Sequence, residues 1–455
     1  MLFKTPGLAE RQVINTWSKN MTINSISLLK AIYFLILVFL PMSFAYSSSE
    51  NITLVYTGNL DGELEPCGCS EGGNKGGLKR RAQALDDLRK DDPDLYLIST
   101  GGLLISEVAQ DKLKSQFILS GMEMLAYDAI GVQWKDLSYG EKFLKTHKLP
   151  FVLSNSRTDF LKQRTIQHKP TPITFFSWLD PTRNPQKKQT SSIALANPEH
   201  LEALLATAKA DNKLTVLATT LPLKLAQRKL PLKNVDILLI KAKYERYGEP
   251  QQIGNMLVLQ PGSRGMRIGK LKLKLNKGKL IHWEHNVIAL PPEVADAPRM
   301  NAWYAAYNQA VKSDYEKRVA LAKNFDREKS PFAGEAVCKN CHQAEYEKWS
   351  NSAHSEAFYS LQDVNKAFDP DCIQCHTVGF NKPGGFIEPT VTENLMHVQC
   401  ENCHGPAKAH ANSAGMTPVT NLGWSKQKIC GQCHIPKHSP DFDIKAYWPQ
   451  ISHGK

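Results

Sequence analysis

Ten cysteines are the most informative residues of this 455-residue chain, because eight of them lie in four copies of the pattern Cys-x-x-Cys-His. Two cysteines three residues apart lie on one helical turn, so both thiols can bond to the two vinyl groups of one haem. The next residue, histidine, then lies under the iron as its proximal ligand. The four copies therefore predict four c-type haems as cofactors. The attachment residues are Cys338 and Cys341, Cys372 and Cys375, Cys400 and Cys403, and Cys430 and Cys433, and the proximal ligands are His342, His376, His404 and His434.

Zinc binding and disulfide formation fit the cysteine pattern less well than haem attachment does. Zinc ribbons pair two Cys-x-x-Cys units around one ion, but zinc binding gives no reason for a histidine directly after every unit. Four disulfides within the motifs would suit an oxidising compartment and would leave the same histidines unexplained. Haem attachment accounts for all three fixed positions of each motif.

Distal ligands are expected among the remaining histidines of the same region. Electron transfer favours six-coordinate iron, because a second histidine limits ligand rearrangement between the two oxidation states. We expect His354, His410 and His453 to be distal ligands, and we rank His397 above His438 for the fourth iron. We predict that His397 caps the iron over His376, so that the protein is a carrier. An open position on that iron would instead favour binding of a substrate.

Cys67 and Cys69 are the two cysteines that haem attachment leaves over. A disulfide across one intervening residue is strained and easily reduced. A redox or soft-metal role for the pair and an inert local disulfide both fit this spacing. The pair follows the end of a predicted strand, which is where α/β folds hold their sites.

The N-terminus has the features of an export signal. Residues 26–40 are almost wholly apolar, and their continuous core at 31–40 is too short to span a bilayer. Small residues at Ser43 and Ala45 fit a cleavage site. We predict a signal peptide over residues 1–45, cleaved after Ala45, which places the mature chain in the periplasm. Met21 is an alternative start, and an uncleaved anchor helix is the alternative to cleavage.

The elements that must position these residues fall into two regions. Short apolar runs at 51–57, 94–100, 151–154, 215–219 and 235–241 alternate with helical patterns at 78–89, 113–127 and 199–209, which is typical of an α/β domain. A β-rich end follows at 256–260, 268–275 and 279–290, and then a helical pattern at 297–323. We predict an α/β domain over 46–292, a helical linker over 293–330 and a mostly α domain over 331–455 whose core is formed by the haems.

The tail resembles the tetrahaem cytochrome c-554 family. The similarity lies at residues 333–338, 349–354, 398–406 and 442–453, and it covers about residues 331–455. Members of that family accept electrons from hydroxylamine oxidoreductase. The resemblance implies that His354, His410 and His453 each cap a haem other than the one they follow in sequence. It also implies a five-coordinate haem on the second motif, although His397 stands where the family has a small residue.

The α/β region resembles the periplasmic 5′-nucleotidase metallophosphatases, at residues 54–66, 76–78, 149–151, 234–240 and 260–263. Such enzymes bind two metal ions with Asp-x-His, a bridging Asp, Asn-His and Gly-His-x-His. The corresponding positions here are Asn59 and Asp61, Gly102, Trp134 and Lys135, and residues 241–244 with two lysines. Two-metal hydrolysis needs carboxylate and imidazole ligands. We therefore expect a metallophosphatase-like α/β sandwich with a degenerate site.

Charge and composition limit the classes of partner. The net charge of +12 and 42% hydrophobic residues are those of a globular, basic chain. No nucleic-acid motif accompanies the charge, so we expect no nucleic-acid binding. The expected function is one-electron transfer between periplasmic or membrane-bound redox proteins, with membrane contact only through an uncleaved signal or the basic face. The alternatives are a haem redox enzyme acting on a small nitrogen or sulfur substrate, residual phosphoesterase activity, and a docking role for the α/β domain.

Overall fold

The computed structural model describes residues 49–66, 74–107, 110–184, 195–240, 248–276, 278–435, 438–439 and 441–453. The predicted signal peptide, the pair Cys67 and Cys69, and Lys241 and Lys243 lie outside these residues. In the described part of the chain, no helix is long and apolar enough to cross a membrane.

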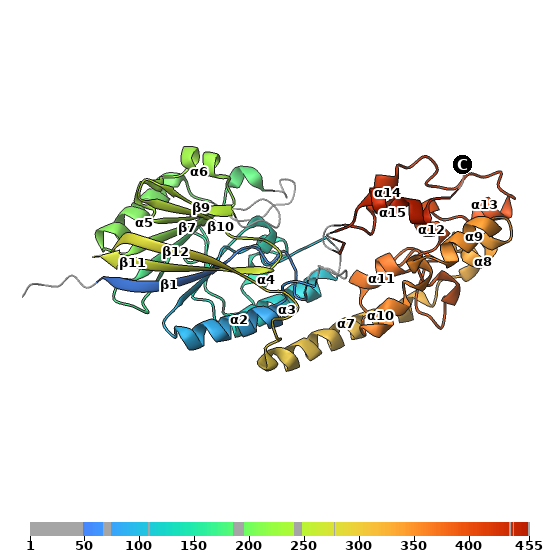
Figure 1. Cartoon of the computed structure of the whole chain (residues 1–455), viewed down its shortest axis with the longest axis horizontal. Coiled ribbons are helices and arrows are strands. Elements are labelled where there is room, and N and C mark those ends of the chain that lie inside the picture. The colour runs from blue at the N-terminus through green and yellow to red at the C-terminus, as the bar shows by residue number, and fades with distance from the viewer. Residues whose placement is uncertain are drawn as a thin grey trace, which may run out of the picture. The chain divides into compact units, whose positions relative to one another are not determined.

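Two six-stranded sheets form the first half of the described chain (Figure 1). The strand order is β12-β11-β1-β2-β3-β4 in the first sheet and β5-β6-β7-β8-β10-β9 in the second. The strands are β1 Glu50–Thr57, β2 Tyr96–Ser99, β3 Ala129–Gly131, β4 Phe151–Val152, β5 Arg164–Ile166, β6 Ile173–Trp178, β7 Leu214–Thr219, β8 Ile237–Ile240, β9 Gly248–Ile253, β10 Met256–Gln260, β11 Arg267–Asn276 and β12 Lys279–Ala289.

Strand β1 organises the first sheet. It runs parallel to β2, with Leu54 opposite Tyr96, and antiparallel to β11, with Leu54 opposite Leu271. Its apolar run is buried on both faces, because Leu54 faces a cluster shared with the second sheet while Val55 faces the helices. A continuous apolar run is what a strand covered on both sides requires.

Helices cover the outer face of each sheet (Figure 1). Helices α2 (Leu78–Asp91) and α3 (Asp111–Met124) pack on the first sheet, and α5 (Pro198–Ala210) and α6 (Leu223–Lys229) pack on the second. Helix α4 (Glu141–Leu144) is a single turn. The layers are therefore helix, sheet, sheet and helix, and the predicted α/β sandwich is confirmed.

Helix α7 (Asn301–Ala322) contributes to two cores. Trp303, Tyr307 and Val311 belong to the cluster between the first sheet and its helices. Tyr315 and Val319, farther along the same helix, belong to the cluster of the C-terminal region. One continuous helix of 22 residues thus packs on both regions.

The C-terminal region consists of short helices joined by turns. They are α8 Glu335–Lys339, α9 Gln343–Ser350, α10 Tyr359–Asp363, α11 Pro370–His376, α12 Cys400–His404, α13 Lys408–Asn412, α14 Lys426–Cys430 and α15 Ile444–Ile451. A small apolar cluster centred on the fully buried Phe358 packs against α7. The region is helical, as the sequence predicts.

Candidate haem sites

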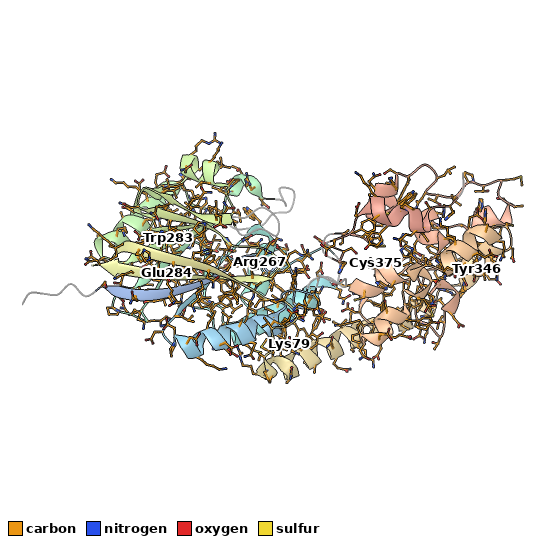
Figure 2. All side chains as sticks on the ribbon, viewed as in Figure 1. Lys79, Arg267, Trp283, Glu284, Tyr346 and Cys375 are labelled. Atoms are coloured by element: carbon orange, nitrogen blue, oxygen red, sulfur yellow. The ribbon has the colours of Figure 1, made fainter. Side chains whose placement is uncertain are left out.

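Each Cys-x-x-Cys-His motif folds as about one helical turn. The second and third motifs lie within α11 and α12, and the first and fourth begin at the ends of α8 and α14. The helical hydrogen bond spans these two motifs as well, because the N–H of His342 donates to Cys338 O over 3.0 Å and that of His434 to Cys430 O over 2.9 Å. The motif cysteines, of which Figure 2 labels Cys375, form no disulfide with one another in the described part of the chain. Each turn therefore holds two thiols and one imidazole close together, as haem attachment requires.

Three of the motif histidines lie opposite a second histidine. The pairs and their ring-centre distances are His342 and His410 at 6.3 Å, His354 and His434 at 6.2 Å, and His404 and His453 at 5.7 Å. Two imidazoles that bind one metal ion from opposite sides, each at about 2 Å, hold their ring centres about 6 Å apart. The three pairs have the spacing that two axial ligands of one iron need.

Hydrogen bonds determine which ring nitrogen of several histidines can bind a metal ion. Nδ1 of His376, His410 and His453 each lies against a backbone carbonyl oxygen, at 2.5, 2.8 and 3.0 Å. A carbonyl only accepts, so Nδ1 carries the proton and the Nε2 lone pair is free for a metal. Burial lowers the pKa of His354, His376, His404 and His434 below its ordinary value, which favours the neutral imidazole that metal binding needs.

His376 has different surroundings from the other proximal histidines. In the described part of the chain, each of the other three proximal histidines has a ring contact with a second histidine, whereas His376 has none. His397 instead packs edge-on against Tyr359, with ring centres 4.7 Å apart. Its Nδ1 accepts the backbone N–H of Phe358 over 3.2 Å, so a neutral His397 carries its proton on Nε2. In that tautomer neither nitrogen offers a lone pair to iron, which counts against the expected role of His397. His438 lies in the turn after the fourth motif, where its N–H donates to Ile435 O over 3.0 Å.

Contacts between cysteines show which motifs are neighbours. The Cys338 thiol forms a hydrogen bond with Cys400, and this contact raises the pKa of Cys338. Cys433 and Cys375 form the same kind of contact, which raises the pKa of Cys433. The first motif therefore lies beside the third, and the second beside the fourth.

The buried carboxylate of Glu401 ties the first motif to the third. It accepts the N–H groups of Ala333 at 3.0 Å, Gly334 at 2.8 Å and Ala407 at 2.7 Å. Glu401 lies within the third motif, whereas Gly334 precedes the helix that leads into the first. Sequence reasoning missed this residue, because only the fold brings those N–H groups to it.

The burial of the C-terminal helices fits a large apolar cofactor. Helices α8, α9, α13, α14 and α15 have no buried residue among those described. Short helices need tertiary packing to be stable in water. A porphyrin beside each motif would supply it, so these helices, the thiols and the histidine pairs fit c-type haem.

The degenerate site of the α/β sandwich contains an ion pair. Nζ of Lys135 lies 2.5 Å from Oδ1 of Asp61, and Asn59 donates to the same carboxylate oxygen over 3.2 Å. Gln133 donates to Oδ1 of Asn59 over 2.7 Å. The described residues contain no group of three or more His, Cys, Asp or Glu side chains able to hold a metal ion. The ammonium group of Lys135 therefore pairs with Asp61 at this site.

Hydrogen bonds to Asp136 fix the loops that contain Gly102 and Gln133. Asp136 is fully buried and accepts the N–H groups of Gly102 at 2.8 Å, Leu103 at 2.6 Å and Gln133 at 2.9 Å. Burial raises the pKa of Asp136, although these hydrogen bonds act in the opposite direction. Gly102 has φ 72°, and a Cβ there would approach Cγ of Asn59 to 2.6 Å. A metal-binding carboxylate at position 102 would therefore displace Asn59.

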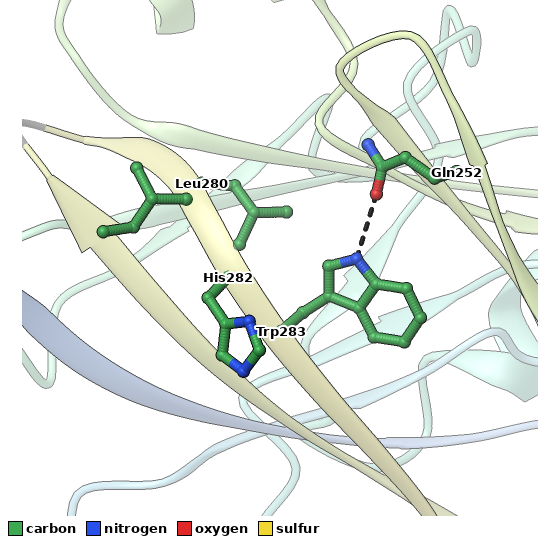
Figure 3. Close-up of a pocket in the computed structure, with 5 residues that line it drawn as sticks. Gln252, Leu280, His282 and Trp283 are labelled. Carbon is green, nitrogen blue, oxygen red and sulfur yellow. Dashed lines mark hydrogen bonds between the residues drawn. The ribbon is translucent and has the colours of Figure 1, made fainter.

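A surface pocket of about 370 Å³ lies on the edge strands of the two sheets (Figure 3). Trp283 of β12 lines it and donates from Nε1 to Oε1 of Gln252 on β9 over 3.0 Å. Leu280, Ile281 and His282 complete the lining. The pocket contains none of the predicted site residues.

The sandwich is a metallophosphatase-like fold. It is similar to the sulfate thiohydrolase SoxB of Thermus thermophilus, solved with glycerol, with a TM-score of 0.50 at 15% identity over 57% of this chain and 60% of that one. It is also similar to a 5′-nucleotidase precursor from Thermus thermophilus, with a TM-score of 0.51 at 16% identity over 70% of this chain and 68% of that one. At these identities the likeness establishes the fold alone.

The C-terminal region is similar to multihaem c-type cytochromes. Residues 337–405 match the family described as cytochrome c554 and c-prime. Cytochrome c-554 of Nitrosomonas europaea is 30% identical over 23% of this chain and 58% of its own length. The multihaem cytochrome MtrA of Shewanella baltica is 30% identical over 26% of this chain and 29% of its own length. The chain thus spans less than two thirds of either relative. Both resemblances predicted from the sequence are confirmed, and c-type haem is the cofactor that they support.

Proposed function

We propose that this chain is an exported tetrahaem c-type cytochrome that transfers single electrons between redox proteins. The observation that carries the proposal is the set of three histidine pairs, each of which joins a motif histidine to a histidine outside the motifs at 5.7–6.3 Å. A c-type haem supplies an iron that alternates between the ferric and ferrous states and so carries one electron. The chain's own residues attach the cofactor through eight thioethers and limit ligand changes at three irons.

Each motif provides one haem site, and the histidine pairs assign the distal ligands of three of the four irons. One haem is held by each of the four segments Cys338 to His342, Cys372 to His376, Cys400 to His404 and Cys430 to His434. His410, His453 and His354 are the distal ligands opposite His342, His404 and His434, respectively.

The fourth iron, bound by His376, is the candidate for a second function. The Nδ1 hydrogen bond of His397 favours an open distal position there, because it leaves the ring without a free lone pair. An iron with an open position binds a small ligand, so this observation supports a haem redox enzyme acting on a small nitrogen or sulfur substrate. Capping by His397 remains the alternative, and it would require that ring to break its bond to the Phe358 N–H.

Location and partners follow from the cofactor. Thioether attachment of haem takes place outside the cytoplasm, so we propose export to the periplasm with signal cleavage after Ala45. The partners would be other periplasmic or membrane-bound redox proteins. We also propose the boundaries 46–292 for the degenerate phosphatase-like domain, 293–330 for the linker and 331–455 for the cytochrome domain.

Mass and spectra test the proposal. The intact mass after acid-acetone extraction should retain four haem masses, and a mass equal to the bare polypeptide would refute the cytochrome function. Optical spectra of the oxidised, reduced and carbon monoxide-treated protein then separate the two functions. A high-spin component from one haem in four, with carbon monoxide binding after reduction, supports the open site. Four low-spin haems that become three in His397→Ala would show that His397 is a ligand.

A further inference from the structure

Two largely buried ion pairs connect the α/β sandwich to the segment that leads into the second haem motif. Lys114, on helix α3, pairs with Asp371, and their side chains are 8% and 15% exposed. Lys366 pairs with Glu65, with 2.5 Å between Nζ and Oε1 and exposures of 15% and 25%. Glu65 also accepts the hydroxyl hydrogen of Tyr304 on α7. Four charged side chains are therefore withdrawn from water where the two regions meet.

The environment keeps both lysines charged. Burial by itself lowers the pKa of Lys114, but the carboxylates of Asp371 and Asp369 outweigh it and raise that pKa above its ordinary value. The same balance holds for the pKa of Lys366, where burial is outweighed by Glu65 and Asp369. Removing one member of a buried ion pair leaves the other charge uncompensated. The pairing thus fixes which surfaces can meet.

Asp371 belongs to the helix that carries the second motif. Asp369 caps α11 by accepting the N–H of Asp371 over 3.1 Å. The carbonyl of Asp369 accepts the N–H groups of Cys372 and Ile373, both over 2.9 Å. Lys114 therefore bonds to the residue directly before an attachment cysteine, within the turn that holds Cys372 and His376.

The packing around these ion pairs is continuous. Phe368 packs against both the cluster of the first sheet and the cluster of the C-terminal region. Nζ of Lys366 donates to Oδ1 of Asn308 on α7 over 2.9 Å and lies 5.5 Å from the ring centre of Tyr304. Apolar contacts and hydrogen bonds hold the charged groups in place, so the pairs are part of a packed interface.

We propose that Lys114 is a positioning residue that the α/β sandwich supplies to the second haem motif. Paired with Asp371, it holds helix α11 in place and sets the reduction potential of the haem on Cys372, Cys375 and His376. This inference rests on the proposed function, because it requires a haem on that motif. Without Lys114, the carboxylate of Asp371 favours ferric iron, which carries one more positive charge than ferrous iron. Without Asp371, the buried ammonium of Lys114 favours the ferrous state.

A double-mutant cycle with a redox titration tests the inference on the full chain. Intact mass first establishes how many haems each variant carries, so that loss of a cofactor is recognised as a failure of the proposed function. Lys114→Met should then change the ratio of oxidised to reduced iron at one haem by about tenfold toward the oxidised form, which is about −59 mV for one electron. Asp371→Asn should shift the same haem in the opposite direction, and the double variant should return it toward the wild-type value.

Two controls separate charge from a general loss of structure. Lys114→Arg keeps the charge and should keep the potential. Lys112→Met removes an exposed lysine from the same helix and should leave all four potentials unchanged. With four haems attached, shifts of the same sign in both single variants, equal shifts of all four haems, or no shift at all would overturn the inference. An opposite, compensating shift confined to one haem would support it.

Discussion

Removing the carboxylate of Glu401 should destabilise the cytochrome region more than removal of any exposed charge near it. The side chain is 4% exposed and accepts three backbone N–H groups, those of Ala333, Gly334 and Ala407. Glu401→Ala leaves these donors without their partner, whereas Glu401→Gln retains one oxygen and turns an NH₂ group toward the others. The two variants therefore remove the acceptor oxygens of Glu401 completely and in part, respectively.

The size of the effect follows from the burial of the donors. Gly334 and Ala407 are buried, and Ala333 is half-buried. A buried N–H that loses its acceptor costs about 1–3 kcal/mol, and water can reach the half-buried one. We expect Glu401→Ala to lower the free energy of unfolding of this region by about 3–5 kcal/mol. Glu401→Gln should lower it by about 1–3 kcal/mol, because one acceptor remains.

Denaturant titration of the haem-loaded protein measures this loss. Loss of histidine ligation, followed in the Soret band, reports on the cytochrome region separately from the sandwich, which is necessary because a two-domain chain is not a two-state system. The matched control is Glu393→Gln, an exposed carboxylate in the same region, which should shift the transition by less than about 0.5 kcal/mol. A change below about 1 kcal/mol in Glu401→Ala would refute the reasoning, because loss of a buried carboxylate with three donors should cost more than that.

Three further perturbations have defined outcomes. His453→Ala removes the ring 5.7 Å from His404, so one more haem should become high-spin and bind carbon monoxide after reduction; an unchanged low-spin spectrum would show that another residue is the ligand. Phe358→Ala empties a fully buried position in the C-terminal cluster, and the Soret transition should lose about 3–5 kcal/mol, whereas a shift below about 1 kcal/mol would mean that the site does not pack as described. Lys135→Ala breaks a partly exposed ion pair with Asp61, so the sandwich should lose about 1 kcal/mol or less. Neither this variant nor the wild type should hydrolyse nucleotides with manganese, zinc or cobalt, and turnover of about 1 per second that disappears in Asp61→Ala would revive the phosphoesterase alternative.

The α/β elements were predictable where the local pattern was strong. The apolar runs predict β1, β7 and β10 to within a residue or so, because strands buried on both faces leave a continuous apolar run. Strand β6 (Ile173–Trp178) is fully buried and was missed, although its β-branched and aromatic residues give the same signal. Strand β3 has three residues, and every position of β9 is exposed or half-buried. Neither contains enough apolar residues to stand out from a loop.

In the candidate site, the attachment residues could be predicted from the sequence, whereas the pairing of the histidines could not. Thioether attachment is local chemistry, so five consecutive residues are enough to predict each haem position. Which histidine lies opposite which motif depends on the tertiary fold, as with His354 and His434, whose ring centres are 6.2 Å apart although 80 residues separate them in the chain. The pair of Lys114 and Asp371 spans 257 residues, and no pattern in either segment predicts it. Ion pairs between segments that are distant in sequence could therefore be identified only in the structure.

At the degenerate phosphatase site, protein groups partner the carboxylates of the described residues. A metal ion would normally balance the charge of Asp61, and here Lys135 at 2.5 Å and the N–H of Arg264 at 3.2 Å take that part. Asp136 is satisfied by backbone N–H groups of the same loops. Since buried polar groups are stable only when they are partnered, these loops hold their conformation with protein groups alone. The proposed influence of the sandwich on electron transfer therefore does not require this site, because it would pass through the ion pair of Lys114 on α3 with Asp371 on α11.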